Sequence, residues 1–184
     1  DKLKIYTPES NLYVNPSWNL GISKIKNENF VLMNDDLLIG KDFCKKIVES
    51  DAFNSEITGL IGVHPASIVQ HEISCETLDI PESSNKPVFK DLTRYLGTGD
   101  WGIAIFGKKK NYYKIPDDLK IIYGDNYLLH KNLMNNKKNF SVSNLPVNHI
   151  HSSSSASREF SKIVGDDIKN SNKYFRSSKE PVLK

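Results

Sequence analysis

The sequence has few cysteines, no long apolar run and no signal-peptide pattern. Its two cysteines, Cys44 and Cys75, form no metal or redox pair motif, so we expect both to be reduced and either buried or incidental. No apolar stretch approaches the ~20 residues that a membrane-spanning helix needs. The sequence therefore predicts no membrane span and argues against secretion by this segment. We expect a cytoplasmic protein of a bacterium or a host cell.

Arginine is also scarce and supplies only 3 of the 25 cationic side chains. Arg is favoured for bidentate reading of phosphates and base edges, so sequence-specific recognition of nucleic acid is disfavoured. The charge is nevertheless uneven, with a net −5 over residues 1–107 and +8 over residues 108–184. This asymmetry suits a protein that gathers an anionic ligand at its C-terminal half, or it reflects a genome biased toward Asn and Lys, as in some viruses and phages.

A chain of this length favours one domain, so we treat residues 1–184 as a single α/β domain. Apolar residues at helical spacing alternate with short apolar runs, and the second half is expected to be partly antiparallel, which predicts a mixed sheet flanked by helices. The predicted helices are 16–27, 41–51, 124–135 and 157–175. The predicted strands or extended segments are 30–33, 58–63, 66–73, 101–106, 119–123 and 139–150. Residues 88–95 are expected to form either a strand or a short helix.

Three of these predictions depend on particular residues. Asn15 and Pro16 are typical of a helix N-cap and of the first helical position. The run 30–33 is bounded by polar residues and is too short for a helix, so it indicates a buried strand. In the last helix, the spacing predicts four side chains facing inward: Phe160, Ile163, Val164 and Ile168.

An acidic cluster follows the predicted strand 30–33. Asn34, Asp35 and Asp36 come directly after its last residue, and open α/β sheets place ligands at the carboxyl ends of their strands. Two adjacent carboxylates repel each other, and a divalent cation between them and an anionic ligand relieves that repulsion. A metal-bound diphosphate is the ligand that this pattern favours. The alternative is that Asp35 or Asp36 only caps the following turn.

The order of several motifs resembles that of glycosyltransferases with the GT-A fold, most closely the large family 2 of mostly inverting enzymes. Residues 18–22 and then 30–36 are similar to the helix and strand that lead to the family's Asp-x-Asp motif. Asn34 stands in place of the first Asp, and Asp36 matches the second. Three later segments are similar to the acceptor-side strand, the segment of the catalytic base and a strand with a metal-binding His, in that order: 99–106, 123–128 and 149–152.

The resemblance covers about residues 3–160 and implies a Rossmann-like GT-A domain with a role for each matched residue. Asp125 would be the catalytic base, with Gly124 where many members carry an acid. The residues implied to bind the donor and its diphosphate are Asn19, Gly21, Asn34, Asp35 and Asp36. Those implied to bind the acceptor are Trp101 and Gly102. The ligands implied for Mn²⁺ or Mg²⁺ are Asp36, His149 and His151.

The family opens with a strand, a helix and a strand that bind the nucleotide base, and this chain starts after them, at Asp1. We therefore expect an N-terminally short or truncated domain. About residues 1–63 would be the remainder of the donor and metal half. Residues 64–160 would form the acceptor and catalytic half, and residues 157–184 the C-terminal helix and tail.

The implied function is metal-dependent transfer of a sugar from a nucleotide-sugar donor to an acceptor hydroxyl, on a glycan, a protein or another molecule, with inversion. Two other functions stay open. A metal-dependent phosphodiesterase or nucleotidyltransferase would use Asp35, Asp36, Asp125 and a His around two ions. A non-catalytic carbohydrate- or partner-binding module would keep the sheet without its nucleotide half. Three local alternatives also remain: Asp125 as an ordinary helix N-cap, His149 and His151 as surface residues of one strand face, and Trp101 as a core residue.

Overall fold

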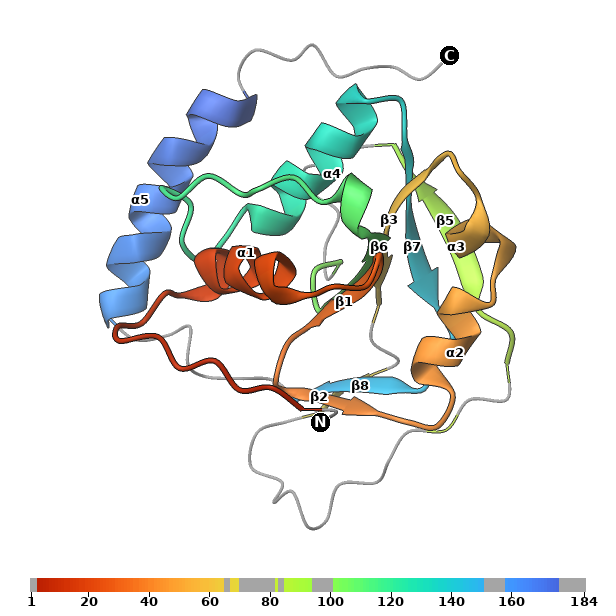
Figure 1. Cartoon of the computed structure of the whole chain (residues 1–184). Coiled ribbons are helices and arrows are strands. Elements are labelled where there is room, and N and C mark those ends of the chain that lie inside the picture. The colour runs from red at the N-terminus through yellow and green to blue at the C-terminus, as the bar shows by residue number, and fades with distance from the viewer. Residues whose placement is uncertain are drawn as a thin grey trace.

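The computed structural model describes residues 3–64, 67–69, 82, 85–93, 101–150 and 158–175 as a mixed α/β fold (Figure 1). Its main sheet has five strands, in the spatial order β1 (Asn29–Met33), β6 (Ala104–Lys108), β3 (Thr58–Val63), β7 (Lys138–Ser143) and β5 (Val88–Leu92). The β3–β7 pair is parallel and the other three pairs are antiparallel. The predicted mixed sheet flanked by helices is confirmed, and this arrangement is compatible with a Rossmann-like fold.

Helices cover both faces of the main sheet. Helices α1 (Val14–Lys24) and α4 (Gly124–Met134) lie on one face, and α2 (Phe43–Val48) and α3 (Asp51–Asn54) on the other (Figure 1). Successive strand residues alternate between the two cores: Leu60 packs with the α1 and α4 side, and Ile61 with the α2 and α3 side. Every residue of β3 is buried, which explains its unbroken apolar run.

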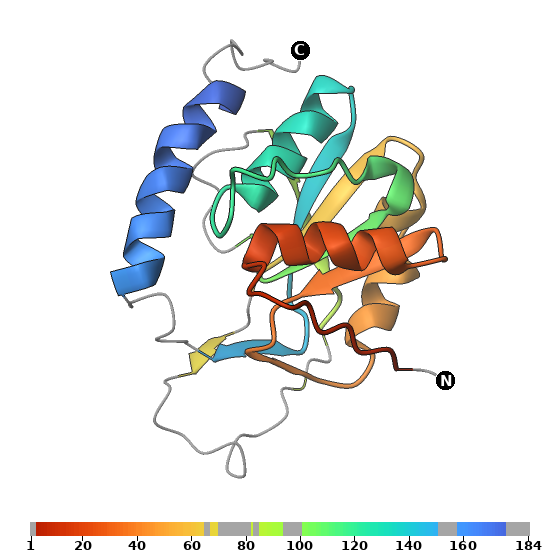
Figure 2. The same ribbon diagram turned by 60° about the vertical axis from the view of Figure 1, so that its left-hand side comes forward.

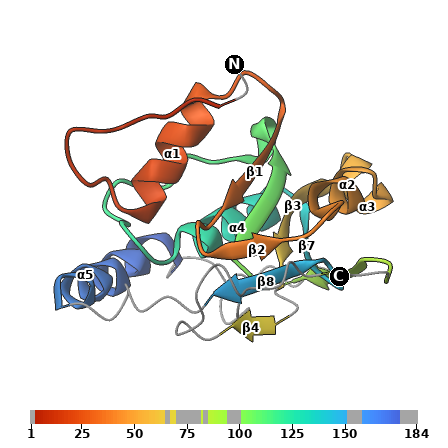
Figure 3. The same cartoon turned by 90° about the horizontal axis from the view of Figure 1, so that it is seen from below.

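A second, three-stranded sheet lies beside the end of β1 and is seen from below in Figure 3. Its order is β2 (Leu37–Ile39), β8 (Val147–Ile150) and β4 (Ser67–Val69), with β2 and β8 antiparallel. The register places Leu37 opposite His149. Asp36, which directly precedes β2, therefore comes close to His149 of β8, although more than a hundred positions separate the two residues in the chain.

The predicted strand at 119–123 is wrong, because this segment pairs with no other strand. Its backbone groups are bound instead by side chains from two helices. On one side, Asn15 Nδ2 donates to the carbonyl oxygens of Leu119 (3.3 Å) and Ile122 (3.1 Å), and the Asn15 backbone N–H donates to Lys120 O at 2.9 Å. Asn15 lies inside α1 and is 1% exposed, so it is not the predicted N-cap.

On the other side, the same segment is bound by α5 (Arg158–Phe175), which packs outside α4 and away from the sheet (Figure 2). The Asp167 carboxylate is 1% exposed and accepts three consecutive backbone N–H groups, from Lys120 (2.8 Å), Ile121 (2.7 Å) and Ile122 (2.9 Å). Residues 119–122 are thus fixed between α1 and α5. Their backbone polar groups are satisfied by these two side chains rather than by a neighbouring strand.

The buried face of α5 is more polar than the spacing predicts. Its buried side chains are Asp167 and Ser171, whereas Ile168 is 48% exposed, so its predicted inward orientation is wrong. Farther along α5, Lys173 Nζ donates to Asp118 Oδ2 at 2.8 Å, and the Tyr174 hydroxyl donates to Asp118 Oδ1. The helix face that contacts the protein is selected by hydrogen bonds as well as by apolar area.

Other elements match the predictions to different degrees. The strand at 58–63 and the helix beginning at Gly124 are confirmed. The strand at 30–33 is confirmed as β1, but it lies at the edge of the sheet, and of its residues only Phe30 is buried. Cys44 is exposed, and Cys75 lies outside the described residues. Over the part of the chain that the structure describes, no helix is both long and apolar enough to cross a membrane.

Replacing Asp167 with alanine should lower the free energy of unfolding by about 2–4 kcal/mol, because three backbone N–H groups lose a charged acceptor. Denaturation in urea measures this change. The matched control is Asp166→Ala, which removes a neighbouring exposed carboxylate 3.7 Å from Lys169 Nζ and should change stability by less than about 0.5 kcal/mol. Equal losses in the two variants would contradict the role assigned to Asp167.

Candidate functional site

A cavity of about 680 Å³ lies where the end of β1 meets the start of β6 and the first turns of α1 and α4. Because β1 and β6 are antiparallel, the last residue of one strand lies beside the first residue of the other. The polar side chains that line the cavity are Asn15, Asn34, Asp35, Asp36, Asp125, Asn126 and His149. The apolar and aromatic ones are Val14, Trp18, Ile103, Ile121, Ile122, Tyr123 and Phe160.

One side of the cavity is formed by the turn after β1. The Asn34 backbone N–H donates to Ile103 O at 3.0 Å, and the Ile150 N–H donates to Asp36 O at 2.8 Å, so both sheets hold this turn. The Asp36 side chain is turned toward β8, with Oδ2 3.2 Å from His149 Nε2. Asp35 is exposed beside it. The structure thus brings together two of the side chains that the resemblance implies as ligands of one metal ion.

The chemistry of this turn fits a divalent cation. Asp36 Oδ1 is buried and has no hydrogen-bond partner among the described residues, although a carboxylate oxygen in that position normally has one. Carboxylate and imidazole are both ligands for such ions, and Mg²⁺ is commonly held by one or two carboxylates together with substrate phosphates. Within the described ranges, no group of three or more His, Cys, Asp or Glu side chains gathers around one point. Protein ligands alone would therefore leave the coordination incomplete.

The opposite side of the cavity carries Asp125, in the first turn of α4. Its Oδ1 accepts the Asn126 backbone N–H at 2.8 Å, and burial raises the pKa of the carboxyl above its ordinary value. A side chain on Gly102 would place a Cβ 2.7 Å from Asp125 Oδ2. The absence of a side chain at position 102 leaves the space that this carboxylate occupies.

The backbone just before Asp125 is unusual. Tyr123 adopts a left-handed conformation (φ 65°, ψ 4°), which is uncommon for a residue other than glycine. A Cβ at Gly124 would overlap Asn15 Oδ1. Asn15 thus occupies the space that a side chain at position 124 would need, which accounts for the glycine there.

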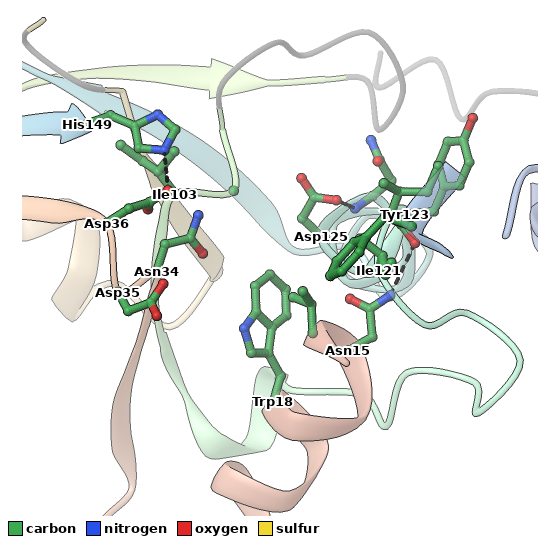
Figure 4. A pocket seen from close by; sticks show the side chains of 15 residues that line it. Asn15, Trp18, Asn34, Asp35, Asp36, Ile103, Ile121, Tyr123, Asp125 and His149 are labelled. Carbon is green, nitrogen blue, oxygen red and sulfur yellow. Dashed lines mark hydrogen bonds and ion pairs between the residues drawn. The ribbon is translucent and has the colours of Figure 1, made fainter. Parts of the chain in front are cut away.

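Figure 4 shows how these groups face one another. Asp36 and His149 lie on one side, Asp125 on the other, and the Trp18 side chain extends into the space between them. Trp18 is half-buried and comes from α1. The cavity therefore brings together an acidic, histidine-containing side, a separate, partly buried carboxylate and an aromatic ring.

The predicted site residues divide into three groups. The structure brings Asn34, Asp35, Asp36, Gly102, Asp125 and His149 to the cavity. Asn19 does not line it, because its side chain binds Ile115 O and N and the Tyr112 hydroxyl at 2.8–2.9 Å. Gly21 lies outside it as well.

Trp101 also lies away from the cavity. It is 0% exposed, packs against Gly62, and donates from Nε1 to Phe140 O at 3.1 Å, so its ring is not available for stacking on a ligand. This environment agrees with the alternative interpretation of the sequence, in which Trp101 is a core residue. His151 lies outside the described residues.

Sequence reasoning missed Trp18, Tyr123 and Phe160 as cavity residues. Trp18 shares helical spacing with Ile22 and Ile25, and that periodicity does not separate a ring at the edge of the core from one inside it. Tyr123 was expected in a strand and Phe160 on an inward-facing helix stripe. No local sequence signal distinguishes these positions, because each is brought to the cavity by packing between distant elements.

Asp125→Asn should stabilise the protein near neutral pH. A carboxyl whose folded pKa is raised contributes stability that is fully present below its unfolded pKa, about 3.9, and is lost as the pH rises through the folded pKa. The variant should therefore unfold at a higher urea concentration than the parent near pH 7, and the difference should shrink toward about pH 4. Asp117→Asn, at an exposed position in the preceding loop, is the control. A loss of stability at neutral pH in the Asp125→Asn variant would contradict this prediction.

Neither a protein-family model, nor a curated protein, nor a solved structure matches this chain, so a functional assignment depends on its own sequence and geometry.

Proposed function

We propose that the chain is a metal-dependent glycosyltransferase of GT-A type, which moves a sugar from a nucleotide-sugar donor to an acceptor hydroxyl with inversion. One observation carries the proposal: a single cavity has the Asp36 and His149 side chains on one side and the partly buried Asp125 on the other. Sugar transfer needs these two functions, charge neutralisation at a leaving diphosphate and a base at the acceptor, in two separate places.

The first side would hold the donor. Asp36 and His149 would hold Mn²⁺ or Mg²⁺, with Asn34 and the exposed Asp35 beside them. When bound, such an ion neutralises the negative charge that develops on a departing diphosphate. The unpartnered Asp36 Oδ1 supports this role, because a buried carboxylate oxygen without a hydrogen-bond donor is well suited to a cation.

The second side would activate the acceptor. Asp125 would take the proton of the acceptor hydroxyl. At the same time, the oxygen of that hydroxyl would form a bond to the anomeric carbon of the donor sugar. The bond from that carbon to the diphosphate oxygen breaks, and its electron pair leaves with the diphosphate. A pKa raised by burial makes Asp125 a stronger base than an ordinary aspartate, which moves it toward the value that suits proton transfer near neutral pH.

The separation of Asp125 from Asp36 favours sugar transfer over the alternative function, phosphodiester cleavage by two metal ions. That alternative needs Asp35, Asp36, Asp125 and a histidine close to the same pair of metals. Asp125 does not join Asp36 and His149 in a common metal-binding group anywhere in the described ranges. A non-catalytic binding module shares the cavity but requires no base, so loss of turnover on removing Asp125 separates it from the transferase.

Asp36→Ala should abolish Mn²⁺-dependent binding of nucleoside diphosphate, because the partly buried carboxylate at the proposed cation site is lost. Calorimetric titration of UDP, GDP, CDP and ADP, each with and without Mn²⁺, measures the effect and also identifies the base. The matched control is Glu49→Ala, which removes an exposed carboxylate at the end of α2. Mn²⁺-dependent affinity close to that of the parent in the Asp36 variant would place the cation elsewhere.

Asp125→Asn should leave Mn²⁺-dependent binding of the diphosphate within a few fold of the parent while lowering turnover by about 10² or more, the usual scale for removing a general base. Turnover is measured as the release of nucleoside diphosphate from a nucleotide sugar. The base of this nucleotide sugar is the one that the calorimetric titration identifies. Asp117→Asn serves as the control, because Asp117 is exposed and pairs with Lys114 outside the cavity. Full turnover in the Asp125 variant would exclude it as the base.

A further inference from the structure

Trp18 is the largest side chain that lines the cavity, and its role in the proposed reaction is unassigned. It is one of only two tryptophans in the chain, and the other, Trp101, is wholly buried and hydrogen-bonded. Trp18 is half-buried, and one edge of its ring packs against the core while the side chain extends into the cavity (Figure 4). Among the described residues, Tyr123 and Phe160 add further aromatic surface to the same lining.

The position of Trp18 limits what can contact it. Any group that passes from a diphosphate held at Asp36 to a hydroxyl held at Asp125 must cross the space between them, and Trp18 lies in that space (Figure 4). The acceptor must touch Asp125, and Trp18, Ile121 and Tyr123 lie on the same side of the cavity as this carboxylate (Figure 4). The acceptor therefore meets an aromatic and apolar surface at the carbon skeleton that bears its reactive hydroxyl.

The charge of the cavity further narrows the chemistry of the acceptor. Three carboxylates line it, from Asp35, Asp36 and Asp125, and none of its described lining residues is Lys or Arg. A polyanion such as DNA would bring phosphates to a negatively charged surface with no cationic side chain to receive them. A neutral sugar ring fits better, because its C–H face can lie on an indole while its hydroxyls bind polar groups around it.

We infer that Trp18 is the platform on which a sugar ring of the acceptor stacks, so that the acceptor is a neutral glycan rather than a nucleic acid or a protein side chain. This inference rests on the proposed function for the identity of the acceptor side. It assigns a specificity-determining role to a residue of α1, whereas the reacting groups come from the end of β1 and the start of α4.

Intrinsic fluorescence provides a direct test, because Trp101 is buried and a change of emission on ligand binding reports on Trp18. The full chain is titrated at millimolar concentrations with the methyl glycosides of glucose, galactose, mannose and N-acetylglucosamine. A single-stranded DNA oligonucleotide and a serine-containing peptide are titrated in parallel. We expect a saturable change with at least one glycoside and none with the oligonucleotide or the peptide.

Two variants and one control connect the change to the ring. Trp18→Ala should weaken glycoside binding at least about tenfold by calorimetry, the scale expected when an aromatic stacking partner is lost. Trp18→Phe should keep binding within a few fold but lose the fluorescence response. Tyr113→Ala, which removes a half-buried aromatic ring outside the cavity, should bind the glycoside like the parent. Circular dichroism confirms that each variant is folded.

The outcomes separate this inference from the proposed function. Glycoside binding needs neither donor nor metal, so it can be present when Mn²⁺-dependent binding of diphosphate is absent. That result would retain Trp18 as a sugar platform and reject the transferase. The inference is overturned if no glycoside gives a saturable change, if Trp18→Ala binds as tightly as the parent, or if the oligonucleotide or the peptide is the preferred ligand.

Discussion

The arrangement of the cavity depends on how the backbone of residues 119–122 is satisfied. This segment has no strand partner, yet it leads directly to the catalytic candidate at the start of α4. Asn15 binds its carbonyl groups from α1, and Asp167 binds its N–H groups from α5. A buried backbone segment without such partners would be strongly unfavourable, so the two helices and the segment between them form one unit. The two polar side chains thereby hold together three elements that contribute lining residues to the cavity, namely α1, α5 and the segment 119–122.

The sequence predicted those parts of the fold that are encoded locally. The apolar run of β3 and the start of α4 carry their own signals, and the acidic turn follows its strand in the chain. Residues 119–123 have the same apolar spacing as a strand, but their conformation depends on Asn15 and Asp167, which lie far away in the sequence. Trp18 is similar: its periodicity marks a buried helix face, and only the tertiary arrangement shows that this face ends at a cavity.

The distribution of charge differs from what the composition suggested. The C-terminal half is basic, but none of the lysines that the structure describes there lines the cavity. Lys110 and Lys108 instead bind Glu56 beyond the far end of β6 and lower the pKa of that carboxyl to about 2, and Lys137 Nζ donates to Glu56 O. Within the described lining, an anionic group of a donor would therefore depend on a bound cation, because no basic side chain is placed to neutralise it.

The pairing of β2 with β8 has a consequence for folding. Leu37 and His149, which face each other in that pair, are separated by more than half of the chain. Contacts between such distant positions require a large loop to close, and they form slowly compared with local turns and helices. The Asp36 and His149 side chains can meet only after this closure. We therefore expect the acidic side of the cavity to be among the last parts of the molecule to assemble, so that partly folded chains lack the contact between Asp36 and His149.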